Sequence, residues 1–362
     1  MAPEMKAQRV LIYRIGSLGD TIVALPCFHL IERQFPDAER ILLTNFPVHA
    51  KAPASAAVLA NSGLVHGYMQ YTIGTRSPMK LLRLAARIRQ FRPDVLIYLM
   101  PPREIDAVRR DRWFFKIGGA VKHIVGQPTG EDSARKTESA SGLYEAEASR
   151  LARMIGEVGD AAPNNLKNWD LRLTQSEREA ATGALGDLDG KPLIVCGPGT
   201  KMQAKDWGRE NWRALVKRLG ERYRNYGLAI IGAKEESSIA DYVSVDWPGR
   251  KANLCGQLSL RSTAAVLERA SVFIGPDSGP MHLAACVGIP CVIAFSARGL
   301  PGVWYPFGQQ HRILYRKVSC FGCNLESCTV ESRRCLTSIS VAEMADAVES
   351  VMPMGLSANR SA

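Results

Sequence analysis

The sequence contains no long hydrophobic run. No apolar stretch approaches the roughly 18 residues of a membrane-spanning helix, although 46% of the 362 residues are hydrophobic. The first ten residues lead into an apolar strand without the hydrophobic segment that a secretory signal needs. We therefore expect a globular cytoplasmic protein, without a signal peptide.

Two patterns of nucleotide recognition are also missing. Gly16 and Gly19 follow an apolar strand, but their spacing is not that of the G-x-G-x-x-G dinucleotide fingerprint. A nicotinamide or flavin site is thus disfavoured, and we expect no cofactor. Aromatic residues make up only 7% of the chain and do not alternate with the basic ones, so we expect no nucleic acid partner.

The cysteines do not suggest a disulfide framework. They are nine, an odd number, and lie in apolar strands and in one late cluster, which fits a reducing cytoplasm. Four thiolates in the cluster could close a tetrahedral zinc site, although the spacing is not that of two C-x2-C pairs. We favour reduced structural thiols, with zinc as the alternative, for Cys320, Cys323, Cys328 and Cys335.

The positive charge is concentrated in one region. The formal net charge is +11, and the segment 76–122 holds 12 Lys or Arg against 4 Asp or Glu. Such a segment is either an ordinary solvated face or a site for an anionic ligand, and its concentration favours the ligand. A phosphorylated lipid or sugar, or an anionic membrane surface, fits it best.

Strands and helices alternate in the first part of the chain. The apolar periodicity predicts helices over 21–35, 77–91 and 143–158, with a further helix and strand around 53–71. We expect a surface loop over 126–142 and buried strands over 10–13, 40–44 and 95–100. This alternation indicates a parallel sheet with helices on both faces.

The same alternation restarts after a polar stretch. Residues 159–192 are punctuated by Gly, Pro and Asp, so we place domains at 1–175 and 176–345, followed by a helix end and tail at 346–362. We expect the last helix, 341–351, to cross back to the first domain. The prediction is an α/β fold of two doubly wound Rossmann-like domains that face each other across a ligand-binding cleft. The strands expected in the second domain are 193–196, 228–231, 271–275 and 291–295, with helices at 208–223 and 280–287.

The stretch 271–295 reads as one strand, helix, strand unit. Its turn brings Asp277, Ser278 and His282 to the start of a helix, where free backbone N–H groups attract phosphate. An ordinary crossover with a capped helix explains the same residues about equally well. Other segments of the chain decide between the two interpretations.

Four segments resemble one known family. Residues 12–26 (IYRIGSLGDTIVALP), 197–207 (GPGTKMQAKDW), 232–236 (GAKEE) and 275–285 (GPDSGPMHLAA) are similar to the heptosyltransferases of glycosyltransferase family 9. These are two-domain GT-B enzymes of lipopolysaccharide assembly. The likeness extends from about residue 9 to the mid-340s.

The resemblance implies a role for each matching residue. Asp20 corresponds to the catalytic base. The donor side would comprise Thr200, Lys201, Lys205, Asp277, Ser278, Gly279 and His282, and either Glu235 or Glu236 as the acid that holds the ribose. The acceptor side would comprise Gly16, Ser17, Gly19, Arg83, Arg109 and Arg110.

The sequence departs from the family at two places. Residues 143–147 (LYEAE) stand where relatives have a histidine and glutamate motif, so the acceptor contacts do not follow from the resemblance. Residues 296–300 (SARGL) replace the common Gly-Pro-Thr-Asp-Pro, so the donor sugar does not follow either.

The resemblance implies an inverting, metal-independent glycosyltransferase. It would move a heptose from ADP-heptose to an anionic lipid-linked saccharide of the lipopolysaccharide type, working in the cytoplasm at the inner face of the inner membrane. A nucleotide-sugar epimerase and a non-catalytic nucleotide-sugar-binding protein are the alternatives. The assignment requires Asp20 and the turn 277–279 to face one shared groove.

Overall fold

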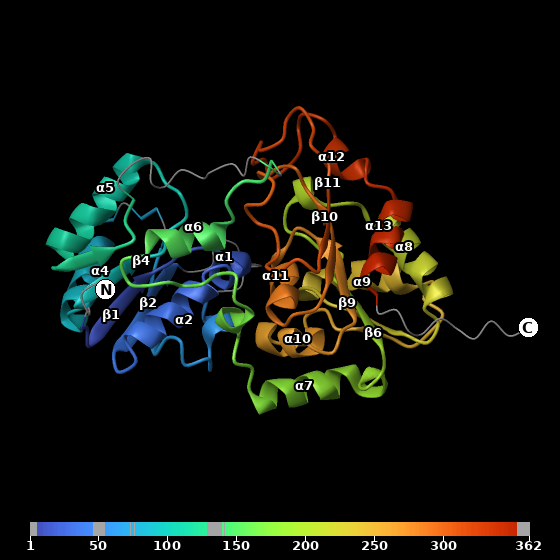
Figure 1. The fold of residues 1–362 in the computed structure, drawn as a ribbon, viewed down its shortest axis with the longest axis horizontal. Helices are drawn as coiled ribbons and strands as arrows, with labels where there is room; N and C mark the ends of the chain where they lie inside the picture. The colour runs from blue at the N-terminus through green and yellow to red at the C-terminus, as the bar shows by residue number, and fades with distance from the viewer. Residues whose placement is uncertain are drawn as a thin grey trace, which may run out of the picture. The chain divides into compact units, whose positions relative to one another are not determined.

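The chain forms two compact units. The computed structural model describes residues 6–45, 55–72, 74–75, 77–128, 140 and 142–352. The units are Met1–Arg172 and Leu173–Ala362, and the predicted boundary was residue 175. Figure 1 shows strands with helices packed against them in each unit.

The first unit contains a five-stranded parallel sheet in the order β3-β2-β1-β4-β5. The central strand β1 places Leu11 beside Ile41 of β2 and Leu96 of β4. Because all strands are parallel, their carboxyl ends and the loops that follow lie along one edge. The strands are β1 (Arg9–Tyr13), β2 (Glu39–Asn45), β3 (Gly67–Tyr71), β4 (Val95–Tyr98) and β5 (His123–Val125).

The helix expected over 21–35 is two helices. These are α1 (Leu18–Ile22) and α2 (Leu25–Gln34), and Pro26 lies in the first turn of α2. Proline lacks an N–H and its ring clashes with the carbonyl four residues earlier, so one continuous helix cannot pass through it. The helix expected over 143–158 is also shorter, because α6 covers only Glu147–Met154.

Helices cover both faces of the first sheet. α4 (Pro78–Phe91) and α5 (Ile105–Trp113), continued by the π-helical turn η1 (Phe114–Gly118), connect β3, β4 and β5 on one face. Their inward residues form a core with the strands that includes Leu84, Ile88 and Phe115. The remaining elements are α3 (Ser55–Leu59) and the 3-10 turn η3 (Leu166–Trp169). Of the predicted segments, residues 53–54, Arg76 and most of the loop 126–142 lie outside the described residues.

The second unit contains a six-stranded parallel sheet in the order β11-β10-β9-β6-β7-β8. Its strands are β6 (Leu193–Cys196), β7 (Gly227–Ile230), β8 (Lys251–Asn253), β9 (Val272–Pro276), β10 (Cys291–Phe295) and β11 (Arg312–Tyr315). Its helices are α7 (Gln175–Leu185), α8 (Arg209–Arg222), α9 (Ser237–Ser244), α10 (Leu260–Leu267), α11 (Gly279–Cys286), α12 (Arg334–Thr337) and α13 (Val341–Val351). The described part of this unit also contains the 3-10 turns η4 (Gly186–Leu188), η5 (Gln203–Lys205) and η6 (Lys234–Glu236).

The last helix stays in the second unit. α13 packs against α8, β9, β10 and β11, and its side chains Met344 and Val348 are buried in the core that contains Trp207 and Trp212. The expectation that it crosses to the first domain is therefore wrong, because its apolar face is already buried here. No helix in the described ranges is long and apolar enough to cross a membrane.

Candidate active site

Gly16 shapes the loop after β1. Its φ of +138° lies in the region that side chains rarely adopt, and a Cβ built there would lie 2.4 Å from the Cβ of Asp20. The N–H of Gly16 donates to Oδ1 of Asn45 at 2.9 Å, which ties the loop to the end of β2. Glycine at this position allows the backbone to fold closely around Asp20.

Asp20 lies in the first turn of α1, where it forms a capping box with the N-cap residue Ser17. The helix begins at Leu18, with Ser17 as the N-cap, so the expected start at residue 21 is wrong. The backbone N–H and the hydroxyl of Ser17 both donate to Oδ2 of Asp20 at 2.8 Å. The side chain of Asp20 remains 23% exposed. The carboxylate is therefore fixed in orientation and still open to a ligand.

Arg14 lies directly behind this carboxylate. It follows the buried strand β1 and is itself fully buried. Its guanidinium donates to the main-chain oxygen of Asp20 at 2.7 and 3.0 Å and to that of Leu99 at 2.7 Å. Its Nη2 also lies 3.6 Å from Oδ1 of Asp20. A buried arginine thus fixes both the helix turn and the acid that the turn carries.

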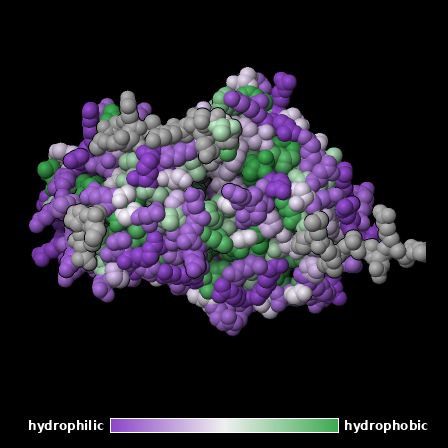
Figure 2. Space-filling view, viewed as in Figure 1, coloured by the Kyte–Doolittle hydropathy of each residue, from purple (hydrophilic) through white to green (hydrophobic). Residues whose placement is uncertain are grey.

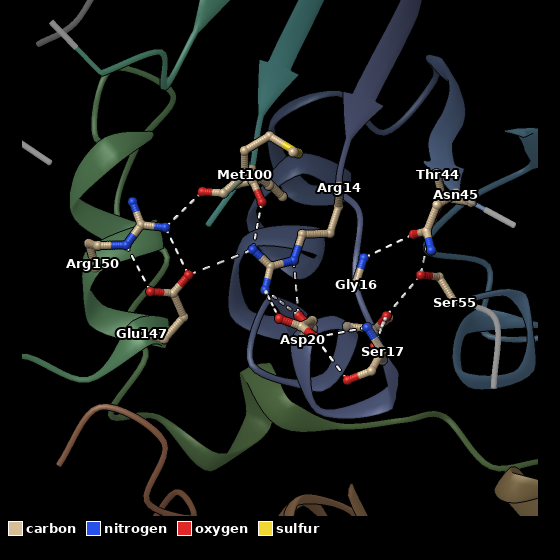
Figure 3. A network of polar contacts seen from close by, with 12 residues as sticks. Arg14, Gly16, Ser17, Asp20, Thr44, Asn45, Ser55, Met100, Glu147 and Arg150 are labelled. Atoms are coloured by element: carbon tan, nitrogen blue, oxygen red, sulfur yellow. Dashed lines mark hydrogen bonds and ion pairs between the residues drawn. The ribbon is translucent and has the colours of Figure 1, made fainter. Parts of the chain in front are cut away.

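A second carboxylate, that of Glu147 on α6, neutralises the charge of Arg14. Oε1 of Glu147 lies 3.7 Å from Nη1 of Arg14, and Arg150 holds Glu147 through two hydrogen bonds of 2.8 Å. Arg150 also donates to the main-chain oxygen of Met100 at 2.8 Å. Figure 3 shows this chain of contacts from α6 through Arg14 to Asp20 and Ser17. The buried charges are paired, as charges at low dielectric must be.

Sequence reasoning missed Arg14, Glu147 and Arg150. Glu147 and Arg150 are three residues apart at the start of a helix, and Arg14 directly follows an apolar strand. These are the signals that could have found them, since charges among apolar residues are seldom buried unless they are paired. The segment 143–147, where the sequence differs from the family, therefore contains Glu147, which contacts Asp20 through Arg14.

The three acceptor-side arginines are exposed on the helices of one face. Arg83 is on α4, and Arg109 and Arg110 are on α5. Arg109 pairs with Asp106 at 3.3 Å. Within the described ranges, the hydrogen bonds and ion pairs recorded for the side chain of Asp20 come from Arg14 and Ser17 and from none of these three.

The second unit brings Lys205 and Asp277 together. Lys205 ends η5 in the loop after β6, and Asp277 follows β9. Because β6 and β9 are neighbours in the sheet, these loops meet at its carboxyl edge. Nζ of Lys205 lies 3.0 Å from Oδ2 of Asp277, and the two side chains are 19% and 9% exposed.

The start of α11 offers hydrogen-bond donors beside this pair. α11 begins at Gly279, with Ser278 as N-cap and Pro280 in the first turn, and His282 is buried on the same helix. The Oγ of Ser278 is buried and finds no hydrogen-bond partner among the described residues. The first N–H groups of a helix are open to an anion. Lys205, the Ser278 hydroxyl and this helix end together suit a phosphate group.

Glu235 and Glu236, the two candidates for the ribose-binding acid, have different surroundings in the structure. Glu235 is exposed, whereas Oε2 of Glu236 accepts the N–H of Ala233 at 2.7 Å. A Cβ on Gly199 would lie 2.2 Å from the Glu236 carboxyl, and one on Gly232 would lie 2.6 Å from its Oε2. Glu236 thus points to the loops after β6 and β7, at the same sheet edge as Lys205.

Thr200 and Lys201 form the turn that precedes η5. The hydroxyl of Thr200 lies 3.4 Å from both the N–H and the carbonyl oxygen of Met202, while Lys201 is exposed.

Tyr305 is a neighbour of Asp277 that sequence reasoning missed. Burial raises the pKa of Tyr305, and Tyr315 and Asp277 add to the shift, so its hydroxyl stays protonated.

Residues 320–335, which we call the cysteine segment, contact the loop that carries Lys205. Ala204 N–H donates to the Glu326 carbonyl at 2.9 Å, and Cys328 N–H donates to Oε1 of Gln203 at 2.8 Å. The Ser296 hydroxyl donates to the Ala204 carbonyl at 2.7 Å, and Arg333 donates to that of Asp206 at 2.8 Å. The cysteine segment and Ser296, which follows β10, therefore anchor η5 together.

The four late cysteines line one small cavity of about 20 Å³. Across the described part of the chain, no group of three or more His, Cys, Asp or Glu is placed to hold a metal ion. Hydrogen bonds from the backbone N–H groups of Arg333, Glu331 and Val330 lower the pKa of Cys328. The tetrahedral zinc arrangement considered from the spacing is not formed.

The chain is similar to heptosyltransferases. The model of glycosyltransferase family 9 (heptosyltransferase) matches residues 150–333, just over half of the chain. Lipopolysaccharide heptosyltransferase 1 of Pseudomonas aeruginosa is 25% identical over 337 residues, which cover 89% of this chain and 88% of that protein.

Two solved structures share the fold. A family 9 glycosyl transferase from Veillonella parvula has a TM-score of 0.74 at 16% identity, covering 97% of this chain and 99% of that one. The E. coli ADP-heptose LPS heptosyltransferase II has a TM-score of 0.65 at 15% identity, covering 96% and 98%. The predicted α/β architecture of two Rossmann-like domains of the GT-B type is confirmed.

Proposed function

Because this chain belongs to glycosyltransferase family 9, the heptosyltransferase family, we propose that it transfers heptose from a nucleoside diphosphate to an acceptor hydroxyl. The transfer inverts the anomeric carbon and needs no metal ion. The observation that carries the proposal is the carboxylate of Asp20, which Ser17 and Arg14 hold in place while it stays partly exposed.

Asp20 acts as the general base. Its carboxylate takes the proton from the acceptor hydroxyl, and the hydroxyl oxygen forms a bond to the anomeric carbon of the donor. The bond from that carbon to the diphosphate oxygen breaks on the opposite face, and the nucleoside diphosphate leaves with the electron pair. Attack and departure on opposite faces invert the configuration.

The second unit binds the donor. Lys205 and the first N–H groups of α11 stabilise the charge that develops on the diphosphate, and the buried Ser278 hydroxyl donates to one of its oxygens. Glu236, which lies beside Gly199 and Gly232, accepts hydrogen bonds from the ribose hydroxyls. Gly199 has no side chain, so a ribose can approach this carboxylate.

The donor is ADP-heptose and the acceptor is an anionic, lipid-linked saccharide of the lipopolysaccharide type. The family supports this choice, as do the similar lipopolysaccharide heptosyltransferase 1 and ADP-heptose LPS heptosyltransferase II. The basic helices α4 and α5 of the first unit, with Arg83, Arg109 and Arg110, attract the acceptor phosphates. The reaction then takes place in the cytoplasm at an anionic membrane surface.

Replacing Asp20 by Asn tests the proposal. We expect donor affinity, measured by calorimetry with ADP-heptose, to stay within about twofold, while transfer to a phosphorylated core saccharide falls by at least about 100-fold. Asp37→Asn changes an exposed aspartate of the same unit and should leave both quantities unchanged.

Three outcomes contradict the proposal. Unchanged transfer by the Asp20→Asn variant would remove its role as base. Release of an epimerised nucleotide sugar without any acceptor would favour an epimerase. Donor binding without transfer by the wild-type protein, across a panel of core saccharides, would favour a binding protein.

A further inference from the structure

The outer side of α4 is basic and apolar and carries no acid. All four charged residues of this helix are positive, namely Lys80, Arg83, Arg87 and Arg89. Among them, Met79 and Leu82 expose 62% and 70% of their surface. A soluble helix usually turns mixed charge to water. Exposed large apolar side chains among charges of one sign are typical of helices that lie on anionic bilayers.

The end of α5 and the turn η1 that follows it continue this surface. Trp113 and Ile117 are 67% and 58% exposed. Arg89 of α4 donates to the main-chain oxygens of Ile117 and Gly118 at 2.8 and 2.7 Å, which joins the two elements. We call this surface the α4–η1 face, and it comprises Met79, Lys80, Leu82, Arg87, Arg112, Trp113, Lys116 and Ile117.

The acids of α5 do not cancel this charge. Asp106 pairs with Arg109, and Asp111 accepts from Arg103 and from the hydroxyl of Tyr98. Over the helices of the first unit, Figure 2 shows green apolar groups set among purple polar ones. The face therefore keeps a positive excess beside its exposed apolar groups.

A basic hollow lies where α4 and η1 end. Its volume is about 690 Å³, and its basic lining residues are Lys6, Arg89, Arg92, Lys122 and His123. The one acid in its lining, Asp94, already accepts the N–H groups of Gln8 and Arg9 at 2.8 and 3.0 Å. The hollow is large enough for a phosphorylated headgroup, and its charge favours one.

We propose that the α4–η1 face docks on an anionic phospholipid bilayer. Its apolar side chains enter the interface while its Lys and Arg meet headgroup phosphates. A nucleic acid would not explain the exposed Leu82 and Ile117. This inference rests on the proposed function, because a lipid-linked acceptor lies in such a bilayer.

The direction of α4 agrees with the proposed docking on a bilayer. α4 follows β3 and leads to β4, so it begins at the carboxyl edge of the first sheet, where Asp20 lies. Met79 and Leu82 are in its first turns. A bilayer along α4 would thus border the edge that carries the proposed base.

Vesicle sedimentation with the full chain tests the proposal without donor or acceptor. We expect at least tenfold more binding to phosphatidylglycerol/phosphatidylethanolamine vesicles than to phosphatidylcholine vesicles, with a strong decrease at high salt. Met79→Ser/Leu82→Ser should weaken the binding roughly tenfold. Lys80→Gln/Arg87→Gln should weaken it roughly 20-fold.

Matched variants control for folding and for total charge. Leu166→Ser alters an exposed apolar residue elsewhere in the first unit, and Lys217→Gln/Arg218→Gln removes two exposed charges from α8. Both should bind vesicles like the wild type. Trp113 should shift its fluorescence to shorter wavelength on anionic vesicles, and Trp113→Phe should remove that shift while most binding remains.

The possible results distinguish a failure of the docking proposal from a failure of the proposed transferase function. Equal binding to neutral vesicles, or binding that the face variants do not change, would overturn the proposal. So would wild-type self-association without vesicles that Met79→Ser/Leu82→Ser abolishes, since the occupant would then be a second copy. Transfer to a delipidated, soluble core saccharide should stay normal in Met79→Ser/Leu82→Ser, and its absence in the wild type would count against the proposed function alone.

Discussion

Nζ of Lys205 lies 3.0 Å from Oδ2 of Asp277, at the edge of the second sheet where α11 begins. The two residues are far apart in sequence and meet because β6 and β9 are adjacent strands. In the proposed donor site, we expect an incoming diphosphate to compete with Asp277 for this ammonium group. The pair therefore sets both the position and the availability of the proposed donor-site cation.

Lys205→Met should reduce transfer more than donor binding. Lysine stabilises the leaving diphosphate most strongly when its charge has developed, so we expect kcat to fall by roughly 100-fold. Steady-state kinetics with ADP-heptose measures this change. Lys217→Met on the exposed side of α8 is the control, and an unchanged kcat for Lys205→Met would exclude the role of Lys205.

Gly16→Ala should abolish transfer while donor binding persists. The new methyl group would meet the Asp20 side chain at 2.4 Å and also requires a backbone conformation with φ of +138°. Gly74→Ala imposes a similar strain at φ of +72° but has open space around its Cβ. If the two variants lost activity equally, strain and not displacement of Asp20 would be the cause.

Glu147→Gln should destabilise the first unit strongly. It leaves Arg14 and Arg150 buried without the carboxylate between them, which typically costs about 3–5 kcal/mol. Urea unfolding measures the change. Glu145→Gln breaks the partly exposed Glu145–Arg153 pair instead and should cost about 1 kcal/mol or less. Similar losses for both variants would contradict the central role of Glu147.

Glu236→Gln should weaken donor binding, and Glu235→Gln should not. Only the Glu236 carboxylate lies against Gly199 and Gly232, so only its loss removes acceptors near the proposed ribose position. We expect the Kd for ADP to rise roughly tenfold, since hydrogen bonds to a charged group contribute about 1.5–3 kcal/mol. Calorimetry with ADP distinguishes the two variants, and the reverse ranking would assign the site to Glu235.

The stability of the second unit should fall as the pH decreases below about 6.5. Nδ1 of His311 accepts the Cys291 N–H at 3.1 Å, and burial lowers the pKa of this imidazole. Below its ordinary pKa the unfolded chain therefore binds a proton that the folded chain does not, so acid favours unfolding.

Urea unfolding between pH 7 and pH 5 checks this prediction. His311→Gln should flatten the pH dependence of the unfolding free energy, and His123→Gln, which changes an exposed histidine of the first unit, is the matched control. Burial also lowers the pKa of His29, so the first unit should respond in the same direction. A steeper dependence in His311→Gln would contradict the assignment.

The sequence by itself determined the local structure and much of the candidate site. Apolar runs bounded by glycine and proline located the strands, and β6 and β10 begin and end where the pattern placed them. The segments around Asp20, Lys205 and Asp277 carried the family resemblance. These features depend on neighbouring residues, which periodicity and turn chemistry describe well.

Only the tertiary structure decided which distant side chains meet. Arg14 reaches Glu147 because the loop after β1 and the start of α6 lie together, and Glu236 faces Gly199 because β6 and β7 are adjacent. The sequence could not choose between Glu235 and Glu236 or identify Glu147 as a partner of Arg14. Such pairings depend on strand order and on the direction of buried side chains, which local sequence patterns do not specify.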